Sequence, residues 1–137
     1  MLALTRRYHF PAAHVLTTPR LSPEENLRIY GKCANPAGHG HDYALELSVT
    51  GPLDARSGSI LARETLDALV ESRVMARFAH RLLNDDPLFA ERVPTAENVC
   101  AVIHELLRGP IAETGARLSR VRVEETRRNS FSIGELS

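Results

Sequence analysis

Three of the six histidines lie where they could bind one metal ion. His39 and His41 occur in the segment Gly-His-Gly-His, with one residue between them. In an extended chain such residues point to the same side about 6.6 Å apart, so two imidazoles can converge on a metal. His14 stands near the end of an earlier predicted strand, and pairing of the two strands would add a third nitrogen. Three histidines with an open fourth position are typical of a catalytic zinc site.

Each of these histidines also has a structural interpretation. Glycine and histidine are common in polar loops, and the pair His39 and His41 fits such a loop about as well as it fits a metal site. His14 lies between Ala13 and Val15, which also fits a buried histidine whose hydrogen bonds are satisfied. A purely structural zinc site is disfavoured, because such sites normally have four protein ligands.

The two cysteines differ in their surroundings. Cys33 lies in a polar segment and follows Lys32, the only lysine, whose charge would lower the pKa of a thiol. A reactive thiol is therefore one interpretation, and a buried structural cysteine is the other. Cys100 lies beside Val99 and Val102 in a predicted helix, which indicates a core residue. Two cysteines are too few for a disulfide framework, so we expect reduced thiols and a cytoplasmic protein.

Hydrophobic periodicity predicts the elements that must position these residues. Alternating apolar residues predict strands, and residues 17–37, rich in Pro, Ser, Asn and Gly, predict a long functional loop. Thr95 is a predicted helix N-cap, and Gly109-Pro110 is predicted to end that helix. The predicted elements are strands at about 2–16, 41–50, 118–125 and around 131–133, and helices at about 62–78 and from Thr95 to Gly109.

The order strand, strand, helix, helix, strand, strand predicts an α+β fold. We expect a four-stranded antiparallel sheet with both helices on one face. A chain of 137 residues has room for one hydrophobic core, so residues 1–137 are predicted to form a single domain. The free edges of such a small sheet favour assembly into a homo-oligomer.

The charge balance excludes some partners. Lys plus Arg number 17 and Asp plus Glu number 17, so the formal net charge is zero. Proteins that bind nucleic acid or a membrane surface usually have a basic excess or stripe, so we expect neither partner. No apolar stretch reaches the roughly 18 residues of a membrane span. The first residues also lack the pattern of a signal peptide.

Longer motifs resemble one known family. Phe10-Pro-Ala-Ala-His14 and the segment 25–43, which contains Gly-Lys-Cys and Gly-His-Gly-His-Asp-Tyr, are similar to motifs of the 6-pyruvoyltetrahydropterin synthase family. That family includes the 6-carboxytetrahydropterin synthases of queuosine biosynthesis. The Asn-Pro and second Gly of the longer segment are closer to the pyruvoyl-type enzymes. The resemblance continues, in the family's order, at 58–61, 80–84, 94–98 and 121–126.

The resemblance implies a fold, a metal and a substrate. The fold is the tunnelling fold (T-fold), whose protomers form rings, so a trimer or hexamer is expected. The metal is zinc, with His14, His39 and His41 as its ligands. The substrate is 7,8-dihydroneopterin triphosphate, converted with loss of triphosphate to 6-pyruvoyltetrahydropterin or, if acetaldehyde also leaves, to 6-carboxytetrahydropterin. In this family residues from neighbouring subunits build each pocket.

The resemblance also implies roles for single residues. Cys33 matches the family's catalytic base, and His80 matches its proton-donating histidine. Glu125 matches the glutamate that anchors the pterin, and a carboxylate suits paired N–H donors. Alternation puts Glu125 on the apolar side of its strand, although a salt bridge at the strand end is the other interpretation. Thr95 either contacts the pterin or only caps its helix.

One position departs from the family pattern. Relatives have Asp before the histidine that His80 matches, and this chain has Ala79. A carboxylate there would orient the imidazole and raise its pKa. Asp85 or Asp86 could replace it. The alternative function is therefore a pterin- and zinc-binding homologue with weak or no lyase activity.

Overall fold

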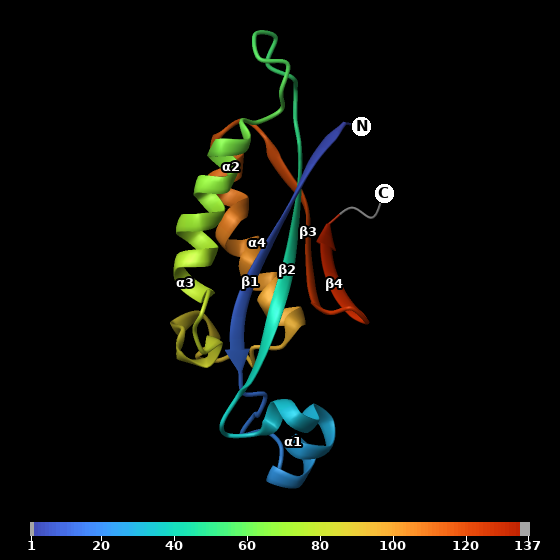
Figure 1. Cartoon of the computed structure of the whole chain (residues 1–137), viewed down its shortest axis with the longest axis vertical. Coiled ribbons are helices and arrows are strands. Elements are labelled where there is room, and N and C mark those ends of the chain that lie inside the picture. The colour runs from blue at the N-terminus through green and yellow to red at the C-terminus, as the bar shows by residue number, and fades with distance from the viewer. Residues whose placement is uncertain (1, 135–137) are drawn as a thin grey trace.

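A four-stranded antiparallel sheet, in the order β1-β2-β3-β4, forms the centre of the molecule. The structure is a computed structural model and describes residues 2–134. Figure 1 shows α2, α3 and α4 on one face of this sheet, as the sequence predicted, with α1 beyond the ends of β1 and β2. The strands are β1 (Ala3–His14), β2 (His39–Thr50), β3 (Arg117–Thr126) and β4 (Asn129–Gly134). The helices are α1 (Pro23–Tyr30), α2 (Arg63–Val70), α3 (Ala76–Phe78) and α4 (Ala96–Glu113), with a π-helical turn (Glu71–Met75) between α2 and α3.

The predicted pairing of the first two strands is confirmed. β1 and β2 pair along their whole length, from Ala3 opposite Thr50 to His14 opposite His39. Residues directly opposite each other in an antiparallel pair lie on the same face of the sheet. Because side chains alternate along a strand, His41 shares this face with the other two histidines.

The core lies between the sheet and the helices. Alternate residues of β2 and β3 face α2, α3 and α4, which explains why each strand has a regular apolar period. Cys100 is 1% exposed among them, so its predicted place in the core is confirmed. Fully buried apolar residues include Leu45, Leu47, Val121 and Val123 of the sheet, Leu66 and Val70 of α2, and Val99, Val102, Ile103 and Leu107 of α4.

The loop predicted at 17–37 is wrong over much of its length. Residues Pro23–Tyr30 form α1, and Gly31–Ala34 form a 3-10 turn directly after it. The helix begins at a capping box, in which the Ser22 side chain accepts from the Glu25 backbone N–H and the Glu25 carboxylate accepts from the Ser22 N–H. This reciprocal cap and the proline at the first helical position stabilise a short polar helix.

The predicted end of the last helix at Gly109-Pro110 is also wrong, because α4 continues to Glu113. A proline inside a helix lacks an N–H donor and crowds the carbonyl four residues before it. The helix nevertheless continues past Pro110, because the following turn buries Ile111, which is 0% exposed. Thr114 then closes the helix by donating from its hydroxyl to the Ile111 carbonyl at 2.6 Å.

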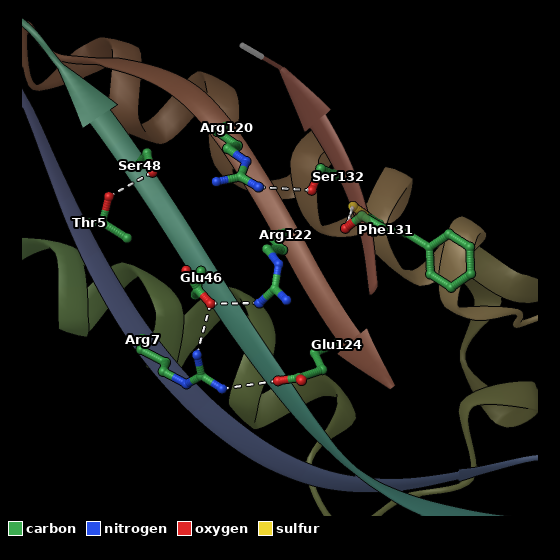
Figure 2. A network of polar contacts seen from close by, with 10 residues as sticks. Thr5, Arg7, Glu46, Ser48, Arg120, Arg122, Glu124, Phe131 and Ser132 are labelled. Atoms are coloured by element: carbon green, nitrogen blue, oxygen red, sulfur yellow. Dashed lines mark hydrogen bonds and ion pairs between the residues drawn. The ribbon is translucent and has the colours of Figure 1, made fainter. Parts of the chain in front are cut away.

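The face of the sheet opposite the helices carries a network of ion pairs, drawn in Figure 2. Arg7 of β1 contacts Glu46 of β2 at 2.9 Å and Glu124 of β3 at 3.0 Å. Arg122 contacts the same Glu46 at 2.7 Å. Glu124 therefore points away from the helices, and its neighbour Glu125 points to the helix side. None of the helices described is long and apolar enough to cross a membrane.

Candidate active site

Three imidazole rings lie in a row where the ends of β1 and β2 meet. The Nε2 atoms of His14 and His41 are 3.2 Å apart. The ring centroids of His39 and His41 are 4.7 Å apart and nearly perpendicular, at 83°. The strand pairing thus brings the three predicted histidines together, and the ring of His41 contacts both of the others.

This cluster fits a metal ion. One ligand atom from each of His14, Cys33 and His41 lies within 4.8 Å of the other two. Two nitrogens that share a tetrahedral zinc, each about 2.0–2.1 Å from it, are about 3.3 Å apart, which matches the 3.2 Å between the Nε2 atoms of His14 and His41. Imidazole and thiolate donors suit zinc. The described group contains Cys33 as its third member, with the ring of His39 next to it.

The pKa values of His14 and His41 are both shifted toward the neutral form, which is the form that binds a metal. His14 is fully buried, and this burial lowers its pKa, with a further lowering from His39. Burial, followed by the neighbouring His14 and His39, lowers the pKa of His41 to about 4. Both rings therefore offer an unprotonated nitrogen at neutral pH.

The orientation of His14 follows from a backbone carbonyl. Its Nδ1 lies 2.9 Å from the carbonyl oxygen of Pro94. Since a carbonyl only accepts, the neutral ring carries its hydrogen on Nδ1, and the lone pair on Nε2 faces His41. His14 is thus both a buried histidine with a satisfied nitrogen and a ring aimed at the cluster, so the two interpretations of the sequence are compatible.

Cys33 lies in the 3-10 turn after α1 and is partly buried. The turn is tied to the end of β1 by a hydrogen bond from the Leu16 backbone N–H to the Cys33 carbonyl. Burial and the carboxylate of Glu125 raise the pKa of the Cys33 thiol, while Lys32 acts in the opposite direction. The expected effect of Lys32 is therefore present, but the other two effects outweigh it.

Glu125 borders the cluster from β3. The pairing of β3 with β4 changes register after Glu124, so Glu125 lies at a β-bulge near the end of β3. Its Oε2 lies 3.9 Å from Nε2 of His41, and its side chain is 16% exposed. Burial and then Glu97 raise the pKa of Glu125, whereas His39 lowers it.

Thr95 begins α4 next to the carbonyl that orients His14. Its Oγ1 accepts a hydrogen bond of 3.2 Å from the backbone N–H of Asn98. The predicted N-cap is therefore confirmed. Contact of Thr95 with a pterin stays a prediction.

His80 lies outside the described metal group. Its backbone has a left-handed φ of 63°, which is uncommon for a residue with a side chain. A hydrogen bond of 2.7 Å from its N–H to the Pro11 carbonyl fixes this turn against the end of β1. His80 is exposed and His41 is partly buried, and both line one groove, so the two histidines approach the same space from different elements.

The carboxylate of Asp86 is engaged by another residue and does not orient His80. Both oxygens of Asp86 accept from Arg77, at 2.9 and 3.0 Å. Ala79 packs against the core. Asp85 is exposed in a 3-10 turn. The possibility that Asp86 replaces the family's aspartate is therefore disfavoured within one subunit.

Two groups near the histidine cluster were not identified from the sequence as functional. The Tyr43 hydroxyl lies 3.2 Å from Nδ1 of His14, and the carbonyl of Pro94 contacts the same nitrogen. The signal for Tyr43 was its place two residues after His41 on the same strand face. A backbone carbonyl gives no sequence signal.

The comparisons with known proteins agree on one family. The family model described as 6-pyruvoyl tetrahydropterin synthase matches residues 3–135. The 6-pyruvoyl tetrahydrobiopterin synthase of Drosophila melanogaster is 39% identical over 130 residues, covering 94% of this chain and 77% of the fly protein. The Homo sapiens enzyme of the same name is 39% identical over 92% of this chain and 86% of its own length. The solved Caenorhabditis elegans 6-pyruvoyl tetrahydropterin synthase superposes with a TM-score of 0.88 at 33% identity, covering 98% of this chain and 96% of that one.

Proposed function

This chain belongs to the 6-pyruvoyl tetrahydropterin synthase family, and we propose that it is a zinc-dependent lyase acting on 7,8-dihydroneopterin triphosphate. It releases triphosphate and forms 6-pyruvoyltetrahydropterin, or 6-carboxytetrahydropterin if acetaldehyde is also lost. The observation that carries the proposal is the 3.2 Å approach of the Nε2 atoms of His14 and His41 beside a partly buried thiol, Cys33. The names of the relatives support the lyase class. Product identification by mass tests it.

The three histidines are proposed to bind the zinc, and His39 completes the set with His14 and His41. The lowered pKa values of His14 and His41 support this assignment for those two rings. When bound, zinc polarises the hydroxyls of the substrate side chain and favours loss of the neighbouring C–H protons. The added positive charge also lowers the pKa of the nearby Cys33 thiol, against the burial that raises it.

Cys33 and His80 move the protons in this proposal. The Cys33 thiolate takes a proton from a side-chain carbon, and His80 returns one. We place the pocket between protomers of a homo-oligomer, a trimer or hexamer, in a single T-fold domain over residues 1–137.

Glu125→Gln is expected to raise KM for the pterin substrate by about 10–100-fold while zinc stays bound. The change removes the negative charge from a carboxylate proposed to accept two N–H bonds from the pterin, and a hydrogen bond to a charged group contributes about 1.5–3 kcal/mol. Steady-state kinetics and zinc analysis measure both effects. Glu124→Gln is the matched control, because Glu124 points to the other face of the sheet and pairs with Arg7. An unchanged KM for Glu125→Gln would remove the anchor role.

A second candidate function rests on Ala79. A pterin- and zinc-binding homologue with weak or no lyase activity would keep the histidine cluster and Glu125 but lack the carboxylate that orients His80. The engagement of both Asp86 oxygens by Arg77 favours this candidate. A purified protein that binds zinc and pterin without turnover would establish it.

Ala79→Asp is expected to raise kcat by about 10-fold or more with KM unchanged, because an adjacent carboxylate orients the imidazole and raises its pKa. Single-turnover kinetics measure the change. The control is Ala76→Asp, which adds the same charge at an exposed position three residues earlier. Equal rates for Ala79→Asp and the unchanged protein would show that His80 does not need this aspartate.

A further inference from the structure

The hydroxyl of Tyr43 contacts one ring nitrogen of His14, Nδ1, while His41 faces the other, Nε2. Tyr43 is 0% exposed, and its oxygen is 3.2 Å from Nδ1 of His14. The ring planes of the two residues are nearly perpendicular, at 81°. Tyr43 thus contacts the ring nitrogen that does not face the cluster.

The same nitrogen has a second partner, so the hydrogen on it is shared. The Pro94 carbonyl, 2.9 Å from Nδ1 of His14, can only accept. The hydrogen on Nδ1 therefore points between that carbonyl and the Tyr43 oxygen. The two oxygens share it in a bifurcated hydrogen bond, in which the contact to Tyr43 is the longer and weaker one. Two acceptors on different elements restrain both the position of the hydrogen and the rotation of the ring.

The Tyr43 ring itself is fixed by packing. It stacks on Phe10 with a centroid distance of 5.3 Å and an interplanar angle of 20°, and it also contacts His41 edge to face at 5.6 Å. β1 and β2 carry the stacked pair directly opposite each other. The hydroxyl therefore stays beside His14 without needing another partner to hold it there.

We propose that Tyr43 is a positioning residue for the metal centre, whose hydroxyl, together with the Pro94 carbonyl, holds His14 as the Nδ1–H tautomer with Nε2 directed at the metal. The inference rests on the metal site of the proposed function and adds a partner to it. A second hydrogen-bond partner on a metal-binding histidine fixes the ring and makes it a better ligand, and loss of such a partner typically lowers metal affinity about 10–100-fold.

Tyr43→Phe tests this directly, since it removes one oxygen and keeps the ring that stacks on Phe10. Zinc affinity of the full chain is measured by competition with a chromogenic chelator, and the cobalt-substituted protein gives a visible absorption spectrum. We expect zinc affinity to fall about 10–100-fold and the cobalt bands to shift. The control is Tyr8→Phe, which removes a hydroxyl that donates to Asp67 at 2.6 Å, and it should leave zinc affinity and the cobalt spectrum unchanged.

Histidine nitrogen resonances of the metal-free protein provide a second readout. The unchanged protein should show His14 as the Nδ1–H tautomer, and Tyr43→Phe should keep this tautomer, because the Pro94 carbonyl still accepts from Nδ1, but with a shifted Nδ1–H resonance, because one of its two acceptors is gone. If Tyr43→Phe does not fold, 3-fluorotyrosine labelling of a Tyr8→Phe/Tyr30→Phe background weakens only the Tyr43 hydroxyl as an acceptor, and zinc affinity should again fall.

The outcomes separate this inference from the proposed function. If the unchanged protein binds no zinc, the metal site of the proposed function is wrong. If the unchanged protein binds zinc and Tyr43→Phe binds it equally well with the same cobalt spectrum, the positioning role of Tyr43 is wrong and the metal site stands.

Discussion

Cys33→Ala is expected to lower kcat for 7,8-dihydroneopterin triphosphate by roughly 10²–10⁴-fold, the range that a general base contributes. The physical reason is that the thiolate form of Cys33 is proposed to accept the substrate proton beside the histidine cluster, within 4.8 Å of the ligand atoms of His14 and His41. Alanine cannot take that proton. The zinc content should stay at the level of the unchanged protein, because the three histidines are proposed to hold the ion.

Cys100→Ala is the matched control for this experiment. Cys100 is the other cysteine, and it lies on α4 in the hydrophobic core. Replacing it is therefore expected to affect stability rather than turnover. Retained turnover in Cys33→Ala would remove Cys33 from the mechanism. Loss of zinc in the same variant would instead make Cys33 a metal ligand.

Replacing either His39 or His41 by Ala is expected to lower zinc affinity by more than the roughly 10–100-fold that loss of a supporting residue costs. His41 has the largest expected effect, because its Nε2 faces that of His14 at 3.2 Å and its ring contacts that of His39. Loss of a ligand leaves two imidazoles, too few for tight binding. Zinc is measured by chelator competition and by metal analysis of the purified variants.

His9→Ala is the control, since His9 is a histidine of β1 that lies five residues before His14 and on the opposite, exposed face. It should retain zinc. Full zinc occupancy in His39→Ala with loss in Cys33→Ala would replace the three-histidine set by one of His14, Cys33 and His41. Full occupancy in His41→Ala would contradict a metal at this cluster.

Local alternation made much of the site predictable. The period of two in β1 and β2 places His14, His39 and His41 on one face, and their convergence needs only that the two strands pair in the register observed. The same alternation put Glu125 on the side of Val121 and Val123. The alternation depends on neighbours along the chain and can be read from the sequence, whereas the register depends on the pairing of β1 with β2.

Other features depend on contacts between distant segments. The Pro94 carbonyl reaches His14 across 80 positions, and the bulge at Glu125 depends on the register of β4. The engagement of Asp86 by Arg77 likewise became visible only in the folded chain. α1 is different, because its capping box at Ser22 and Glu25 is readable in the sequence, whereas the loop was predicted from the composition of the segment alone.

The most direct test of the lyase is to incubate the zinc-loaded protein with 7,8-dihydroneopterin triphosphate and identify the products by mass. We predict release of triphosphate together with 6-pyruvoyltetrahydropterin, or with 6-carboxytetrahydropterin and acetaldehyde. Unchanged substrate in the presence of a protein that still binds zinc and pterin would contradict the lyase, and it would make the absence of a carboxylate at Ala79 the first explanation to examine.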